Sequence, residues 1–111
     1  MATISLTQQK NLVHTDNVTW AAVTGSDVGE AREYAKFNDK TVQVFGTFGD
    51  DLTIQGSNDG TNWATLSDSS GLPLVFTAAG IKLIAENPRY IRPSAGASIT
   101  SVTVVIQATR S

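Results

Sequence analysis

Oxygen-rich side chains gather in two turns near the middle of the sequence, and their types could bind a metal ion. Asp50 and Asp51 form one turn, and Asn58 and Asp59 form the next. Calcium takes about six to eight oxygen ligands, so these carboxylates with backbone carbonyls could form a site. The order Ser-Asn-Asp-Gly-Thr-Asn, however, lacks the alternating acidic ligands and final glutamate of an EF-hand loop. Turn residues bonding their own backbone explain the pattern better, so we expect no metal and no cofactor.

Enzymatic chemistry finds little support in the other residue types. His14, the single histidine, lies close to Asp16 at the end of a segment that we expect to be an N-terminal arm. A catalytic dyad needs a nucleophile and an orienting acid held rigidly, which an arm does not provide. No Asp or Glu lies within an apolar run, so the sequence shows no candidate for the acid of raised pKa that glycoside hydrolysis requires. We therefore expect a protein that is not an enzyme.

Two arginines and a tyrosine lie close together between two prolines. In an extended strand, Arg89 and Ile91 would point one way and Tyr90 and Arg92 the other. Tyrosine and arginine are enriched at the hot spots of protein interfaces. Alternatively, the tyrosine packs and the arginines pair with carboxylates such as Glu86, and the sequence leaves both interpretations open. The candidate partner-contact residues are Arg89, Tyr90, Arg92, Lys10 and His14.

The positions of the two tryptophans distinguish a packing role from carbohydrate binding. Trp20 is in phase with Val18 and Ala22, which predicts that it lies in the core. Trp63 directly follows an Asn-Asp-Gly turn, and we expect it to be buried at one end of the fold. An exposed tryptophan on a groove would instead indicate a carbohydrate-binding module.

The composition describes a small, weakly charged protein. The 111 residues include only 16% charged side chains, with a formal net charge of -2 and no cysteine. Basic residues are scattered, so we expect no nucleic-acid partner. No apolar run predicts a membrane span, and the first residues do not predict a signal peptide. A surface poor in charge favours contact with other proteins, and a chain without disulfides suits folding in a reducing cytoplasm.

Alternation of apolar and polar residues predicts the strands that must position these side chains. In residues 101–109, the clearest run, Val102, Val104, Ile106 and Ala108 share one face. Residues 17–23 form a second run, with Val18, Trp20 and Ala22 on one face. Shorter candidates bounded by Gly, Pro or Asn are residues 63–66, 73–77, 81–85 and 89–92. Pro73, Pro88 and Pro93 are expected at strand ends, where no ladder hydrogen bond is lost.

Residues 41–63 are predicted to be the centre of the fold. Two alternating runs flank the turn at residues 49–51, with Val42 and Val44 on the apolar face of the first and Leu52 and Ile54 on that of the second. This pattern predicts a β-hairpin, followed by a turn at residues 57–60 and a third strand. Gly46 interrupts the first run and indicates a bulge or a close backbone approach.

Residues 29–37 are the segment whose secondary structure the sequence leaves open. Glutamate, alanine and arginine there would suit a two-turn helix, and the same residues also alternate as the two faces of a strand. We favour the strand because every neighbouring segment is predicted to be β.

The expected fold is all-β: an antiparallel, jelly-roll-like β-sandwich of about eight or nine short strands. Residues 1–16 are expected to form an N-terminal strand and arm, with its strand at residues 3–7. That arm could lie on the body or reach a neighbouring chain. Residues 17–111 are expected to form one domain.

Three sequence features resemble a known family: the run VQVFGTFGDDLTIQGSNDGTNWATL, the motif NPRYIRP, and the Thr- and Val-rich C-terminal strand. Together they resemble the capsid decoration (staple, or cement) proteins of epsilon15-like short-tailed bacteriophages, over roughly Trp20 to the C-terminus. The matching residues, taken as fold-defining, are Gly56, Ser57, Asn58, Asp59, Gly60, Trp63, Arg89, Tyr90, Arg92 and Pro93.

The resemblance implies a structural virion protein. Such a protein is made in the host cytoplasm, binds the outer surface of the capsid, bridges neighbouring major capsid subunits and stabilises the head, without catalysis. The resemblance also implies a homodimer or another symmetric self-contact. The alternative function is a carbohydrate-binding β-sandwich module of a phage tail or host-recognition structure.

Overall fold

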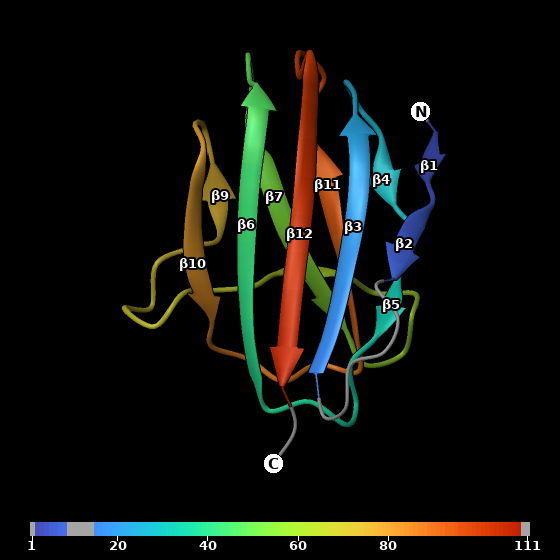
Figure 1. Ribbon diagram of the computed structural model, residues 1–111, viewed down its shortest axis with the longest axis vertical. Helices are drawn as coiled ribbons and strands as arrows, with labels where there is room; N and C mark the ends of the chain where they lie inside the picture. The colour runs from blue at the N-terminus through green and yellow to red at the C-terminus, as the bar shows by residue number, and fades with distance from the viewer. Residues whose placement is uncertain (1, 9–14, 110–111) are drawn as a thin grey trace.

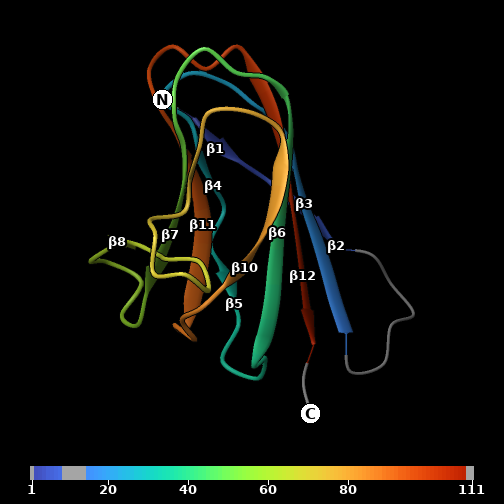
Figure 2. The same ribbon diagram turned by 90° about the vertical axis from the view of Figure 1, so that its left-hand side faces the viewer.

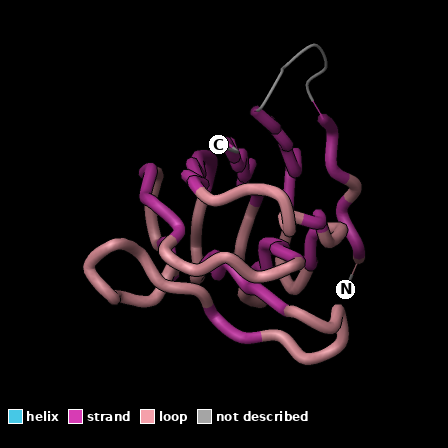
Figure 3. Tube along the Cα trace, turned by 90° about the horizontal axis from the view of Figure 1, so that it is seen from below, coloured by secondary structure: helices cyan, strands magenta, loops and turns pink. Residues whose placement is uncertain are grey.

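Two β-sheets packed face to face make up the protein (Figure 1, Figure 2). The structure is a computed structural model that describes residues 2–8 and 15–109. These residues form twelve strands, seven in sheet A and five in sheet B. The described chain contains strand and loop but no helix (Figure 3). The predicted all-β sandwich is therefore confirmed, and the strand count exceeds the expected eight or nine because several strands are only two residues long.

Sheet B has the strand order β10-β6-β12-β3-β2. Its strands are β2 (Leu6–Gln8), β3 (Thr15–Val23), β6 (Asp39–Thr47), β10 (Gly80–Ile84) and β12 (Ser101–Thr109). The central strand β12 has the predicted bounds and pairs antiparallel with β6 on one side and β3 on the other. Its predicted apolar face points into the core, where Val102, Val104, Ile106 and Ala108 have no exposed surface.

Sheet A follows the order β1-β4-β11-β7-β8, with β5 also paired to β11 and β9 also paired to β7. Its strands are β1 (Thr3–Ile4), β4 (Val28–Gly29), β5 (Arg32–Glu33), β7 (Leu52–Ser57), β8 (Ala64–Thr65), β9 (Val75–Phe76) and β11 (Tyr90–Ala95). The pairing of β1 with β4 is parallel, and the other pairings are antiparallel. The long pair β7–β11 forms the centre of this sheet.

The hairpin predicted within residues 41–63 is wrong. Strands β6 and β7 belong to different sheets, and the turn at residues 49–51 carries the chain from one sheet to the other (Figure 2). The inward-facing residues are nonetheless the predicted ones: Val42, Val44, Leu52 and Ile54. Both strands face the same core, so alternation identifies the buried face but not the neighbouring strand. At Gly46, where φ is 132°, a Cβ would stand 2.4 Å from Ser101 O, which confirms the predicted close backbone approach.

A β-bulge in β3 changes one predicted facing. Val18 and Trp20 are buried as expected, but Ala22 is exposed, and Val23 occupies the next core position. Ala22 has a φ of 56°, and the register between β3 and β12 shifts at this point. An extra residue in one strand moves all later side chains to the opposite face, which a strict two-residue period does not anticipate.

Residues 29–37 form neither a helix nor one continuous strand. Gly29 ends β4, Arg32–Glu33 form β5, and the chain turns at residues 35–36. Tyr34 is buried with its ring edge-on to Phe37, at 5.8 Å between centroids. The preference for strand is therefore right only for two short pieces, because each piece pairs with a different part of β11.

Pro93 lies inside β11 and not at a strand end, so this prediction is wrong. Its partner on β7 is Ile54, whose N–H donates to Leu74 O and whose carbonyl accepts from Leu66 N. Those bonds point away from β11, so Pro93 removes no bond from the β7 ladder. The side of Pro93 that lacks an N–H faces the break between β4 and β5, where no ladder partner is required.

The N-terminal segment adds a strand to each sheet (Figure 1). β1 pairs with β4 in sheet A, and β2 pairs with β3 in sheet B. Ala2 N donates to the buried Asp27 carboxylate at 3.0 Å, which fastens the start of the segment. Residues 2–8 thus lie on the body, the first of the two expected alternatives.

Apolar side chains from both sheets fill the space between them. Trp20 is the largest fully buried side chain, and its Nε1 donates to Glu30 O at 2.9 Å. This hydrogen bond satisfies the polar atom that a buried tryptophan carries. The prediction that Trp20 lies in the core is confirmed.

Candidate protein-contact surface

The outer face of sheet A carries the arginine and tyrosine side chains that the sequence identified. Strand β11 points Ile91 into the core, where it is 0% exposed, and places Tyr90 and Arg92 on the opposite, partly exposed face, as alternation predicts. Arg89 precedes the strand and is exposed, so it does not share the inward face of Ile91. Trp63, just before β8, reaches the same outer face. We call Trp63, Arg89, Tyr90 and Arg92 the arginine–aromatic cluster.

Arg92 and Trp63 form the ordered centre of this cluster. The guanidinium carbon of Arg92 lies 4.0 Å from the centroid of the Trp63 ring, within the range of a cation–π contact. Arg92 Nε also donates to Gln55 Oε1 at 2.9 Å across the β7–β11 ladder. Partial burial lowers the pKa of Arg92, although arginine stays protonated in proteins. The two contacts hold the guanidinium over the aromatic ring.

Arg89 lies at the exposed margin of the cluster. Its Nε donates to Glu33 Oε2 at 2.9 Å, and its guanidinium carbon lies 5.2 Å from the Tyr90 ring centroid. The hydrogen bond that Arg89 donates to Glu33 raises the pKa of Arg89. The alternative interpretation, in which arginines pair with carboxylates, therefore holds for Arg89, but its partner is Glu33 and not Glu86. Both side chains of this pair are about half exposed, so it contributes little to stability.

A hydrogen-bonded turn, residues 57–62, lies next to the cluster. Arg89 N donates to Asn58 Oδ1 at 3.0 Å, which ties the start of β11 to the turn after β7. Gly60, with a φ of 79°, lies close to Tyr90, since a Cβ there would be 3.5 Å from the tyrosine ring. Asp59 accepts hydrogen bonds from within the turn, and these lower its pKa. The turn therefore lies close against the tyrosine ring.

Trp63 is half-buried on the surface and is not part of the core, so the prediction of its burial is wrong. Leu66, only 5% exposed, fills the core position of this segment. The physical reason is that the turn at residues 57–62 is held outside the sandwich by its own hydrogen bonds, and Trp63 leaves it on the outer side. On the surface it meets Arg92 of β11, which lies two strands from β8 in sheet A. The sequence alone does not provide that register.

The two acidic turns do not come together. Asp50 and Asp51 precede β7, whereas Asp59 follows it, so the turns lie at opposite ends of a six-residue strand. Asp50 accepts hydrogen bonds from Asp51 N and Ser98 N, which lower its pKa. Each turn thus bonds its own surroundings, as the favoured interpretation predicts. Within residues 2–8 and 15–109, no three His, Cys, Asp or Glu side chains are grouped to hold a metal ion.

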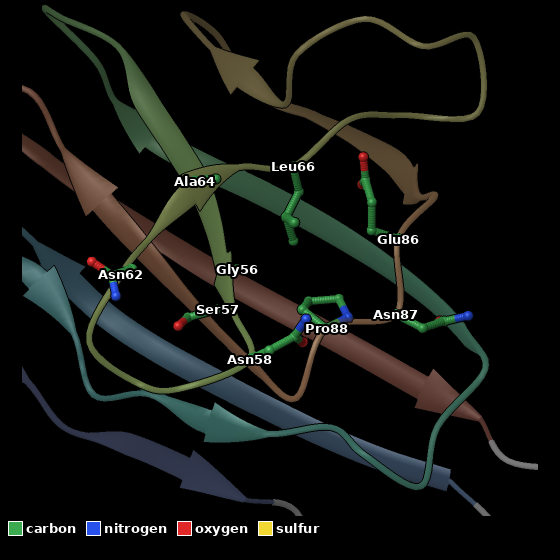
Figure 4. Close-up of a pocket in the computed structure, with 9 residues that line it drawn as sticks. All are labelled: Gly56, Ser57, Asn58, Asn62, Ala64, Leu66, Glu86, Asn87 and Pro88. Atoms are coloured by element: carbon green, nitrogen blue, oxygen red, sulfur yellow. The ribbon is translucent and has the colours of Figure 1, made fainter.

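A shallow pocket of about 400 Å³ lies beside the turn (Figure 4). Its lining residues are Gly56, Ser57, Asn58, Asn62, Ala64, Leu66, Glu86, Asn87 and Pro88. Burial alone would raise the pKa of Glu86, but hydrogen bonds from Ser67 Oγ and Ser67 N hold it below its ordinary value. Asn87 Oδ1 accepts from the buried Lys40 Nζ, whose pKa is lowered by burial. These polar groups are used to fasten the loop to the sheets.

Two predicted contact residues have no described position. Lys10 and His14 lie outside the residues that the structure describes. The three remaining candidates, Arg89, Tyr90 and Arg92, come together on one face. Trp63 is the member of this surface that the sequence did not assign as a contact residue.

Solved structures share this fold at low sequence identity. The SPBc2 prophage-derived protein YomS matches with a TM-score of 0.67 and 13% identity, over 90% of this chain and 98% of that one. A cupin domain from Bordetella pertussis Tohama I matches with a TM-score of 0.52 and 12% identity, over 94% and 91% of the two chains. An RmlC-like cupin from Methanocaldococcus jannaschii matches with a TM-score of 0.55 and 8% identity, over 95% and 78%.

At these sequence identities, the comparisons establish a shared fold. No family model and no curated protein matches the sequence. The double-sheet architecture is therefore shared with a prophage-derived protein and with cupins, and the jelly-roll-like prediction is confirmed. Along the described part of the chain, no helix is long and apolar enough to cross a membrane.

Proposed function

We propose that this protein is a structural component of a phage particle that binds the outer capsid surface and bridges neighbouring major capsid subunits. The observation that carries the proposal is the arginine–aromatic cluster on the outer face of sheet A. The sequence resemblance to capsid decoration proteins and the fold shared with a prophage-derived protein support it. The protein needs no catalytic group for this role.

The cluster has the composition of an interface hot spot. Tryptophan, tyrosine and arginine dominate the energy of protein interfaces when they are held in place and lose water on binding. Arg92 lies over the Trp63 ring and donates a hydrogen bond to Gln55, so little side-chain freedom remains to be lost on binding. Many symmetric copies on a shell would add avidity to a weak single contact.

Binding to empty shells tests the proposal. Purified protein is mixed with undecorated shells of a short-tailed phage of the kind that it resembles, and bound protein is measured by co-sedimentation. We expect saturable binding and a higher force or temperature for shell rupture. Tyr90→Ala should weaken binding at least about tenfold, the loss expected of a hot-spot residue. Lys36→Ala, an exposed residue outside the cluster, is the matched control and should bind normally.

Binding that does not saturate, or equal binding by the wild type and Tyr90→Ala, would reject this role for the cluster. Thermal unfolding of each variant shows whether a loss of binding reflects a loss of fold.

A carbohydrate-binding module is the second candidate, and the partial exposure of Trp63 is the observation that favours it. A sugar ring could stack on the tryptophan face that Arg92 does not cover. Titration with host surface polysaccharides should then quench Trp63 fluorescence, with Trp63→Phe as the control. Buried Trp20 should not respond.

A further inference from the structure

The outer face of sheet B differs in character from that of sheet A. Four antiparallel registers align one outward residue from each strand into a row across the whole sheet: Ile81, Gln43, Val105, Thr19 and Thr7. A second row, from β10 to β3, contains Leu83, Thr41, Gln107 and Asn17. All of these side chains are apolar or uncharged.

Charge is nearly absent from this face. Among the described outward residues of β2, β3, β6, β10 and β12, Asp39 at one end of β6 is the single charged side chain. The charged residues of these strands otherwise point inward or lie at the edge, as with Asp16, Lys40 and Lys82. The arginine–aromatic cluster and its partner Glu33 lie on the opposite side of the sandwich. An interface core is typically depleted of charge in this way.

Large apolar side chains stand out from the same face. Phe45, Ile81 and Leu83 are 45%, 62% and 44% exposed, and they account for three of the four exposed large hydrophobic residues described. Between the two rows lies a shallow hollow of about 180 Å³. Its lining residues are Asn17, Thr41, Gln43, Ile81, Val105 and Gln107. A surface with both apolar projections and a hollow can fit another surface of the same kind.

We propose that the outer face of sheet B is a self-association surface, and that its occupant is the same face of a second copy of this chain. A face with a single charge at one end meets its own copy with little like-charge repulsion, which permits the contact between identical patches that a two-fold axis creates. Strands β3, β6 and β12 have nine residues each, β10 has five and β2 has three. At about 3.4 Å per residue and about 4.8 Å between strands, they present roughly 570 Å². Two such faces would bury about 1,100 Å² in total, above the roughly 1,000 Å² expected of a biological interface.

The geometry also gives the dimer a role, and this step rests on the proposed function. A two-fold axis that relates two stacked faces lies in the plane between them. The two sheets A then lie on the outside of the dimer, and their arginine–aromatic clusters point in opposite directions. Each cluster could bind a different capsid subunit, so pairing through sheet B would produce a bridging molecule.

Sedimentation velocity on the purified full chain tests the pairing without any shell. We expect the wild type to sediment as a dimer at micromolar concentration. Gln43→Glu adds one charge near the centre of the face with little change of shape. Ile81→Glu adds one on β10, the strand at one edge of the sheet. Each should raise the dimer dissociation constant at least about tenfold, because an unpaired carboxylate would be buried.

Leu72→Glu is the matched control, because Leu72 is 59% exposed, close to the 62% of Ile81, but lies on the loop before β9. It should remain as dimeric as the wild type, and all three variants should unfold at nearly the wild-type temperature. A monomeric wild type at 100-fold higher concentration, or dimers that both sheet B variants leave intact, would overturn the proposal. A dimer that fails to bind shells would contradict only the proposed function.

Discussion

A single carboxylate organises the turn that supports the arginine–aromatic cluster. Asp59 Oδ1 accepts from Thr61 N, Asn62 N and Ser57 Oγ, each at 2.8 Å, and Oδ2 accepts from Asn62 Nδ2 at 2.7 Å. The sequence predicted this turn because Asn, Asp, Ser and Gly bond their own backbone or accept positive φ. It did not predict that the turn would carry Trp63 to the surface, because that position depends on the strands behind it.

Replacing Asp59 should destabilise the protein in a way that depends on pH. The backbone hydrogen bonds from Asn62 and Thr61 lower the folded-state pKa of Asp59 below its ordinary value of 3.8. A lowered folded pKa contributes stability that is fully present above pH 3.8 and is lost as the pH falls through the folded value. Asp59→Ala should therefore unfold at a lower temperature than the wild type at pH 7, and the difference should narrow below pH 3.8. If the unfolding temperatures of Asp59→Ala and the wild type differed as much below pH 3.8 as at pH 7, the lowered pKa of Asp59 would not be the cause.

At the scale of elements, the sequence predicted strands better than it predicted their neighbours. Residues 101–109 alternate without interruption, and β12 has those bounds. The neighbours of β6 and β7 were wrong because alternation reports which face is buried and carries no information on pairing. The interior position of Pro93 was also missed, because it depends on a break between β4 and β5 that only the assembled sheet contains.

Gly29 lies against Pro93, and this contact predicts how much one added methyl group would destabilise the protein. A Cβ on Gly29 would lie 2.4 Å from Pro93 Cδ and 2.7 Å from Trp20 Cδ1, and neither ring can move without disturbing the core. Gly29→Ala should lower the free energy of unfolding by about 1–3 kcal/mol, the usual cost of overpacking. Urea unfolding measures it, with Gly80→Ala as the control. A Cβ at Gly80 would lie 3.9 Å from Phe76, an ordinary contact. Similar free energies of unfolding for the two variants would show that the core adjusts to a methyl group at Gly29.

At the scale of the molecule, an ion pair joins the two sheets at one end of the sandwich. Asp16 on β3 of sheet B receives Arg32 Nη2 at 2.9 Å and Arg32 Nε at 3.2 Å from β5 of sheet A. Gln8 Nε2 donates to the same carboxylate at 2.6 Å. The sequence offered Asp16 only as a neighbour of His14, and Arg32 only as part of a segment of uncertain structure. Their contact exists because the two sheets face each other, which no local pattern contains.

Removing Arg32 should test how strongly this pair holds the sheets together. The Asp16 side chain is 2% exposed, so among the described residues Arg32→Ala would leave this buried carboxylate with Gln8 as its remaining partner. Because Arg32 itself is 28% exposed, water can replace part of the lost contact, and we expect a cost of about 2 kcal/mol in urea unfolding. Adding Asp16→Asn to Arg32→Ala removes the unpaired charge and should recover part of that loss. A cost for Arg32→Ala no larger than that of an exposed pair, below about 1 kcal/mol, would mean that apolar packing alone joins the sheets.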